Sequence, residues 1–321
     1  MIAPHVAPAP PRRAISAVVV LAAALVGLAV LAACIGPAGW RAPWNWDAIV
    51  LELRAPRVAL GAVVGASLAI AGLALQVLLH NDLAEPYVLG LSGGASAGAV
   101  MSLALGALPP GVGAAAGAVV AATLVRGIAR GPFDPSRLLL AGIALGAVGS
   151  SITGLILAAA PPERLMRAAT FWLFGGLGTP HWRAVLVPAL VLVLAAAWML
   201  GRAERLDRLG LGADTATALG VDVPRLRRGV LGAVVALTAA TVAVAGMVGF
   251  VGLVAPHVAR RWVGASVRRC LPAAALGGAA LVILADLAAR AAIAPREVPV
   301  GLVTALVGGP FFLWQLQRRT A

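Results

Sequence analysis

Few residues in this chain have both the type and the position to do chemistry. Asp286 is the one carboxylate inside a long apolar segment, and Arg290 follows four residues later, on the same face of a helix. An acid in such a segment is a functional candidate by default, for example as a proton carrier. The alternative is a structural acid paired with Arg290. The lack of a second titratable group in that segment favours this alternative.

Other kinds of chemistry are excluded by what the chain lacks. All 25 basic residues are Arg, so there is no Lys to form a Schiff base or to contact nucleotide phosphates in a P-loop. Any ATP hydrolysis must therefore belong to another subunit. Four scattered His and two Cys do not have the spacing of metal ligands. We expect no catalytic residue, no bound cofactor and no metal in this chain.

Composition identifies the class of protein. Hydrophobic residues make up 61% of the 321 residues, and charged residues only 12%, about half the share usual in soluble domains. The chain lacks the polar residues that would cover a soluble surface, so a soluble globular fold, a disordered chain and a disulfide scaffold are excluded. The sequence predicts an integral membrane protein. At about 20 residues per span, its length allows roughly eight to eleven helices.

The apolar segments predict ten membrane spans in one polytopic domain, residues 1–321. The ends of the spans follow from the runs of apolar residues. They lie near 14–36, 58–80, 87–108, 111–128, 138–160, 184–200, 229–247, 249–264, 271–291 and 299–316. The segment 161–179 connects the fifth span to the sixth. We expect the polar segment 201–228, between spans six and seven, to be a cytoplasmic coupling segment.

The first apolar segment allows a second interpretation. It follows Arg12 and Arg13 and contains Leu31-Ala32-Ala33-Cys34, which resembles the cleavage site of a lipoprotein signal. Its length of about 23 residues suits a spanning helix better than a signal region of about 7–15 residues. We therefore expect an uncleaved first helix. A mature N-terminus at Cys34 would contradict this.

Charge predicts the orientation of the spans. With the N-terminus in the cytoplasm, 17 of the 25 Arg lie in inner segments. Positive residues prefer the cytoplasmic side of membrane proteins. Ten spans place both termini on the same side. We therefore expect a multi-pass protein of the bacterial inner membrane with both termini in the cytoplasm.

Two short sequences resemble each other across half of the chain. Residues 54–64, RAPRVALGAVV, align with residues 225–235, RLRRGVLGAVV, at seven of eleven positions. Five spans separate the two copies, so the copies would run in opposite directions through the membrane. This is the arrangement of inverted repeats in transporters.

Small residues at four-residue spacing predict close packing between helices. The longest row lies in span 138–160 and consists of Gly142, Gly146, Ser150 and Gly154. Such a row lies on one helix face and lets another backbone approach closely. Ordinary helix packing is one explanation. A subunit interface or the wall of a pathway for a bulky solute is the other.

Several blocks resemble those of FecCD-like permeases, the membrane subunits of ABC importers for iron–siderophores, haem and cobalamin. These blocks are residues 54–57 (RAPR), 81–95 (NDLAEPYVLGLSGGA), 249–260 (GFVGLVAPHVAR) and 286–311. They follow the order and spacing of the family. Asp82 departs from it, because the family usually has Pro at that position.

The resemblance implies an all-α membrane fold of about ten helices with an inverted internal repeat, as in cobalamin-importer permeases, the type II ABC importers. It implies a homodimer with a substrate pathway along the dimer axis, lined partly by spans five and ten. Two cytoplasmic ATPase subunits would hydrolyse ATP with Mg²⁺, and a periplasmic binding protein would deliver the substrate. The expected function is therefore binding-protein-dependent import. The substrate would be an iron chelate such as a siderophore, haem or cobalamin.

The resemblance also implies roles for individual residues. Arg54, Arg57 and Arg290 would receive acidic residues of the binding protein, because Arg presents a planar fork to carboxylates. They could instead only end their helices at the membrane surface. Asn81 and Leu83 would belong to an inner gate, with a plain turn as the alternative. Gly142, Gly146, Ser150 and Gly154 would line the pathway.

The segment 213–221 resembles the coupling helices that sit in a groove on the ATPase. A short helix ending at Gly220 suits that role, and an ordinary surface loop is the alternative. The residues concerned are Ala213, Asp214, Thr215, Ala216, Ala218, Leu219, Gly220 and Val221.

Two other functions compete with the ABC permease. An ion-coupled secondary transporter would use Asp286, and uptake driven by an ion gradient alone would distinguish it. A polytopic membrane enzyme ranks last, because no nucleophile and base lie at a workable spacing.

Overall fold

The computed structural model describes residues 11–36, 39–40, 47–129, 131, 133–159, 163–292 and 297–320. The chain is almost entirely helical in these residues. Its first half contains α1 (Pro11–Cys34), β1 (Ile35–Gly36), β2 (Gly39–Trp40), the π-helical turn η1 (Val50–Arg54), α2 (Ala55–Leu79), the 3₁₀ turn η2 (Pro86–Leu89), α3 (Leu91–Leu105), α4 (Pro110–Ile128) and α5 (Pro135–Ala159). Its second half contains α6 (Glu163–Phe174), α7 (Trp182–Leu200), α8 (Ala203–Leu209), α9 (Ala213–Ala218), α10 (Val223–Ala245), α11 (Val251–Val263), α12 (Val267–Ala292) and α13 (Val300–Thr320).

Each of the ten predicted spans coincides with a helix. Seven helical segments of the described residues are long and apolar enough to cross a membrane, and α3 and α13 are shorter apolar helices. The remaining predicted span, 249–264, coincides with α11, which has 13 residues. The predicted fold class, an all-α membrane protein, is confirmed. Outside the spans, the described residues form three further α-helices, namely α6 within the connecting segment 161–179 and α8 and α9 within 201–228.

The second span begins earlier than the apolar pattern predicts. It was expected to start at residue 58, but the helical segment runs from Val50 to Leu79. The difference arises because Arg54 and Arg57 are 6% and 7% exposed and are paired inside the protein. A prediction from apolar residues ends a span at each Arg, whereas a buried helix can run through an Arg that is paired in the protein interior.

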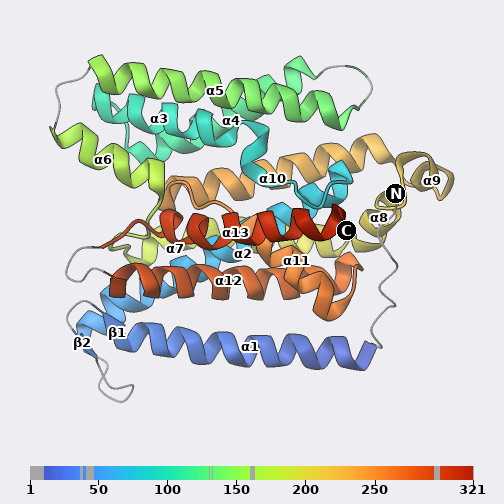
Figure 1. Cartoon of the computed structure of the whole chain (residues 1–321), viewed down its shortest axis with the longest axis horizontal. Helices are drawn as coiled ribbons and strands as arrows, with labels where there is room; N and C mark the ends of the chain where they lie inside the picture. Colours follow the sequence, from blue (N-terminus) through green and yellow to red (C-terminus); the bar gives the residue numbers. More distant parts are fainter. Residues whose placement is uncertain are drawn as a thin grey trace.

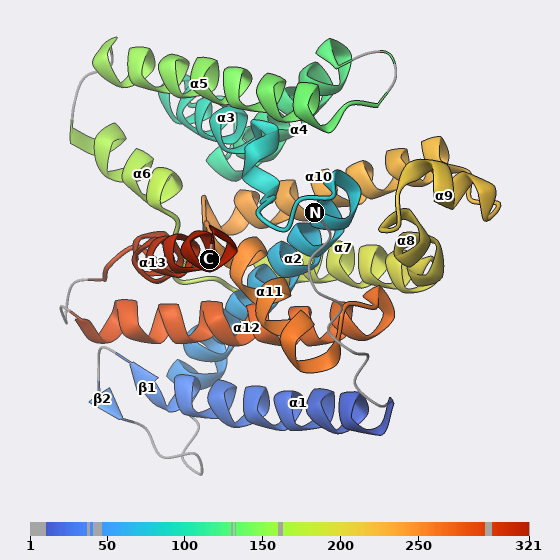
Figure 2. The same cartoon turned by 45° about the vertical axis from the view of Figure 1, so that its right-hand side comes forward.

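Helix α2 forms the centre of the molecule. It is flanked by α10, α11 and α12, and α1 packs on the far side of α12 (Figure 1). Helices α3, α4 and α5 form a separate layer that packs mainly within itself and contacts the rest of the chain through α10, α6 and η2 (Figures 1 and 2). The buried apolar side chains of α2, α10 and α12 are divided between the largest core cluster and two smaller ones.

The two ends of the molecule differ. Helices α8 and α9 lie at one end, together with the start of α1 and the end of α13 (Figure 1). The antiparallel pair β1–β2, in which Ile35 faces Trp40, lies at the opposite end. We refer to them as the α8–α9 end and the β1 end. The start of α1 and the end of α13 therefore share one side, as an even number of spans requires.

Glycine contacts bring the backbones of neighbouring helices together. A Cβ atom on Gly65 would overlap the carbonyl of Gly278 in α12, and one on Gly98 would overlap the carbonyl of Gly113 in α4. Small residues at such crossings allow van der Waals contact along the helices, which is a main source of helix association in membranes. Gly65 of α2 and Gly98 of α3 therefore serve close packing between helices.

The two copies of the repeat lie at the starts of two antiparallel helices. Residues 54–64 begin at the β1 end, in η1 and α2, and residues 225–235 begin at the α8–α9 end, in α10 (Figure 1). The two helices pack against each other, and the one that contains residues 54–64 is the more deeply buried. The predicted opposite directions of the two copies are confirmed.

Candidate functional site

Arg57 lies between two carboxylates at the β1 end. Its Nε and Nη2 atoms are 3.0 and 2.9 Å from Asp286 Oδ1. Its Nη1 donates to both carboxylate oxygens of Glu297, at 2.8 and 3.0 Å. The Asp286 side chain is 2% exposed, whereas Glu297 is 40% exposed. Arg57 thus joins a buried acid to one that reaches the surface.

Arg290 and Arg54 hold the end of α1. Arg290 pairs with Asp286 Oδ2 at 3.0 Å and donates to the carbonyl oxygen of Ile35 at 2.8 Å. Arg54 donates to the carbonyl oxygen of Cys34 at 2.8 Å. The last carbonyls of a helix lack partners within it, and cationic side chains suit the negative end of the helix dipole. These two arginines therefore cap α1 and fasten it to α2 and α12.

The structure brings all three predicted docking arginines together. Arg54, Arg57 and Arg290 are only 6%, 7% and 4% exposed, and their guanidinium groups face partners within the chain. Docking stays a prediction, and it requires some of these contacts to be exchanged for contacts with another protein. The contacts do not match the alternative of arginines that only end their helices at the membrane surface, because all three side chains are buried and have partners inside the chain. The predicted pairing of Asp286 with Arg290 is confirmed. Arg57 and Glu297 as further members of the cluster were not foreseen.

The predicted coupling segment folds as a short helix. Helix α9 covers 213–218, and Gly220 adopts φ +78°, the left-handed conformation that commonly ends helices at Gly. Ala216 and Val221 are buried and hold the segment against α8 and α10. Leu219 is 49% exposed. The helix and its end at Gly220 are confirmed. The contact with an ATPase stays a prediction.

Asn81 and Leu83 form a compact turn after α2. The side chain of Asn81 accepts a hydrogen bond from the backbone N–H of Leu83 at 3.0 Å. The next residue of the same turn, Asp82, pairs with Arg260 of α11 at 3.3 Å. This geometry matches the alternative of a plain turn, tied to α11. The gate role is not contradicted by it and stays a prediction.

The break between α10 and α11 is held by residues that the sequence did not single out. Glu85 accepts a hydrogen bond from the backbone N–H of Phe250, whose φ of +67° is rare for a bulky residue. The hydroxyl oxygen of Tyr87 accepts from the N–H of Val248 at 3.2 Å. Burial raises the pKa of the Glu85 carboxyl to about 7, although the Phe250 N–H opposes this rise. The turn after α2 thus positions the start of α11.

The row of small residues in α5 divides into two parts. Gly142 packs on the backbone of η2, and Gly146 faces α3, while Gly154 has open space beside it. Ser150 and Gly154 line a hollow of about 280 Å³. Its other lining residues are Ser92, Ser96, Thr153, Leu157, Leu173 and Met247. One half of the row therefore serves packing, and the other half borders a hydroxyl-lined space. A role in a pathway stays a prediction.

Among the described residues, no three His, Cys, Asp or Glu side chains lie close enough together to hold a metal ion. The charged groups instead form paired clusters, of which the one around Asp286 is the most buried.

A model of the FecCD transport family matches residues 14–318. The haemin transport permease HmuU of Yersinia pestis is 38% identical over 87% of this chain and 88% of its own. The vitamin B12 import permease BtuC of Vibrio parahaemolyticus is 37% identical over 84% and 82% of the two chains. The iron(III) dicitrate permease FecD of Escherichia coli is 38% identical over 95% and 99%. FecC, a permease protein for iron(III) dicitrate in the same organism, also matches, at 40% identity over 85% and 84%.

A solved structure shares the whole fold. It is described as a metal-chelate type ABC transporter in an inward-facing conformation, and it matches with a TM-score of 0.88. The match covers 94% of this chain and 99% of that chain, at 29% sequence identity.

Proposed function

The chain belongs to the FecCD transport family, and on that premise we propose that it moves an iron chelate, haem or cobalamin as the permease of a binding-protein-dependent ABC importer. The chain is a multi-pass membrane protein. The observation that carries the proposal is the family match over residues 14–318, together with a fold that agrees over nearly its whole length. Relatives named for haemin, vitamin B12 and iron(III) dicitrate support a substrate of this kind.

In this proposal the permease supplies alternating access and no catalysis. Two separate ATPase subunits use ATP and Mg²⁺ at the α8–α9 end, and a binding protein docks at the β1 end. The exposed short helix α9 supports the first contact. The second contact would be made by the three arginines at the β1 end, after they exchange some of their contacts within the chain. Each partner would favour one packing of the helix bundle. The α8–α9 end then faces the cytoplasm of the inner membrane, with both termini on that side.

A pair of identical permeases is the assembly we propose. The alternative is a pair of two different permease chains, which is favoured by the match to both FecD and FecC of Escherichia coli. The mass of the complex after expression of this chain with its ATPase distinguishes the two assemblies. Two copies of this chain support the first, and a requirement for a second permease chain supports the alternative.

Uptake into proteoliposomes tests the proposed function. The chain is reconstituted with its ATPase and binding protein, and haem, cobalamin and iron(III) citrate are offered separately. We expect uptake of one of them that requires ATP and is lost with an inactive ATPase. Uptake by the chain alone, driven by an ion gradient, would instead establish the secondary transporter that uses Asp286. The ion pairs of Asp286 with Arg57, at 2.9 Å, and with Arg290, at 3.0 Å, argue against that alternative, because a proton on Asp286 would weaken both.

Charge reversal tests the docking surface. Replacing Arg54 and Arg57 by Glu would weaken binding of the binding protein, because its carboxylates would meet like charge. The exposed Arg137, in the pair with Asp134, serves as the matched control. Docking that survives the reversal at Arg54 and Arg57 would remove this role. The proposed import function would not depend on that outcome.

A further inference from the structure

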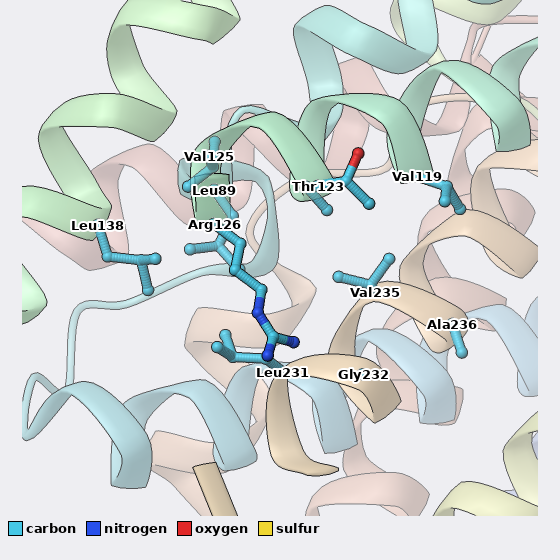
Figure 3. A pocket seen from close by; sticks show the side chains of 11 residues that line it. Leu89, Val119, Thr123, Val125, Arg126, Leu138, Leu231, Gly232, Val235 and Ala236 are labelled. Atoms are coloured by element: carbon cyan, nitrogen blue, oxygen red, sulfur yellow. The ribbon is translucent and has the colours of Figure 1, made fainter. Parts of the chain in front are cut away.

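A hollow of about 270 Å³ lies between α4 and α10 and has no role in the function described above. Figure 3 shows it from close by, with α4 on one side and α10 on the other. Its walls are mostly apolar and come from η2, α4, α5 and α10. Around it, the α4 side chains Val119, Leu124 and Ile128 are 44%, 50% and 65% exposed. Such a surface suits the hydrocarbon of a membrane.

One charged side chain lines this hollow. Arg126 lies in the last turn of α4, and its side chain reaches toward Leu231 of α10 (Figure 3). It is exposed and makes no hydrogen bond or ion pair with any other described residue. By contrast, the nearby Arg137 pairs with Asp134. The α4–α10 hollow thus combines an apolar interior with a cation at the end of a span.

The repeat provides a second observation. Gly232 lines the hollow, and a Cβ atom there would meet nothing within 4 Å. The aligned glycine of the other copy is Gly61, and a Cβ atom there would lie 3.1 Å from the Leu177 side chain. The space beside Gly61 is therefore filled by a leucine of the protein. The matching space beside Gly232 is left open.

We propose that the α4–α10 hollow binds an anionic phospholipid from the leaflet in which α4 ends. The phosphate would lie on the Arg126 guanidinium, and part of an acyl chain would fill the apolar space beside Gly232. Anionic lipids bind at basic pockets between membrane helices at the cytoplasmic side. The α8–α9 end contains the C-terminus of α4 and the N-terminus of α10, so the headgroup faces the cytoplasm in the orientation proposed above. The inference does not depend on which solute is transported.

Native mass spectrometry of the full-length chain, purified and stripped of lipid, tests the site. Phosphatidylglycerol and phosphatidylcholine with identical acyl chains are added separately. For the unchanged chain we expect about fivefold tighter binding of phosphatidylglycerol, the effect of one Arg near a membrane surface. Arg126→Gln should abolish this preference. Arg268→Gln, at an exposed arginine of α12 outside the hollow, should keep it.

A second variant tests the acyl part of the site. Gly232→Leu fills the open space and should reduce the binding of both lipids, whereas Gly27→Leu in α1, where a Cβ atom also meets nothing, should not. Equal affinity of the unchanged chain for the two lipids would overturn the proposal. So would an equal effect of Arg126→Gln and Arg268→Gln, or full binding by Gly232→Leu. Displacement of the lipid by millimolar glycerol phosphate would identify a site for a soluble phosphate and would also overturn it.

Discussion

Among the side chains that the structure describes, Asp286 is the one carboxylate that contacts both Arg57 and Arg290, and it therefore holds the arginine cluster together. Removing one member of a buried ion pair leaves the other charge without compensation, at a cost of about 3–5 kcal/mol. We therefore expect Asp286→Asn to lower the melting temperature of the purified protein strongly. Glu297→Gln should have a smaller effect, below about 1 kcal/mol, because Glu297 is 40% exposed.

Asp134→Asn is the control for this prediction, because it removes an acid from an exposed pair and should change little. The opposite pattern would be informative. An unchanged melting temperature combined with a complete loss of uptake in Asp286→Asn would contradict the structural role and favour ion coupling.

Glu85 gives a prediction about pH. Its carboxyl has a pKa raised to about 7 by burial, so the folded protein binds a proton that the unfolded chain releases near pH 4.5. Stability from this group therefore falls as the pH rises from about 4.5 through 7. Glu85→Gln can still accept the N–H of Phe250 without burying a charge. We expect its melting temperature to exceed that of the unchanged protein by an amount that grows between pH 5 and pH 8, measured in the same detergent.

At the scale of the elements, the crossings of α3 with α4 depend on glycine. Gly98→Val would push a side chain into the carbonyl of Gly113, whereas Gly127→Val in α4 would meet open space. Overpacking of a tight contact costs about 1–3 kcal/mol or more. We expect Gly98→Val to lower the yield and melting temperature of the purified protein. Equal behaviour of the two variants would show that the close contact contributes little.

Helix α9 gives a prediction about coupling. Leu219 and Leu211 are exposed leucines of the same region, at 49% and 67%, but only Leu219 lies within the segment 213–221. If α9 sits in a groove of the ATPase, Leu219→Ser should reduce association with the ATPase and transport-linked ATP hydrolysis more than Leu211→Ser does. Copurification and ATPase assays in proteoliposomes measure the two effects. A larger effect of Leu211→Ser would move the contact to the turn between α8 and α9.

At the scale of the whole molecule, the proposed orientation can be tested by cysteine labelling. Cys34 and Cys270 are free and buried, so they give little background. A cysteine at Leu211, at the α8–α9 end, should react with an impermeant reagent only after the cells are opened. A cysteine at Glu297, at the β1 end, should react once the outer membrane is permeable. The reverse pattern would contradict a cytoplasmic α8–α9 end.

The sequence by itself determined the class, the ten helices and the family, because these depend on local properties. Apolar runs of span length, the Arg residues between them and blocks such as 249–260 can be recognised without knowing which side chains are in contact. The end of the short helix at Gly220 is also a local property, because glycine readily adopts the left-handed conformation that ends a helix.

Only the tertiary structure decided which side chains meet. Arg57 and Asp286 are 229 residues apart, and Glu85 and Phe250 are 165 apart, so no local pattern reveals these contacts. For the same reason the apolar pattern predicts the start of the second span too late. The burial of Arg54 and Arg57 depends on partners from α1, α12 and the segment before α13, which a local pattern does not contain. The difference between Gly61, which is covered by Leu177, and Gly232, which is open, is also a property of packing. Burial depends on contacts between residues that are far apart in the chain. Burial in turn determines whether a charged side chain is paired inside the protein and whether the space beside a glycine is filled.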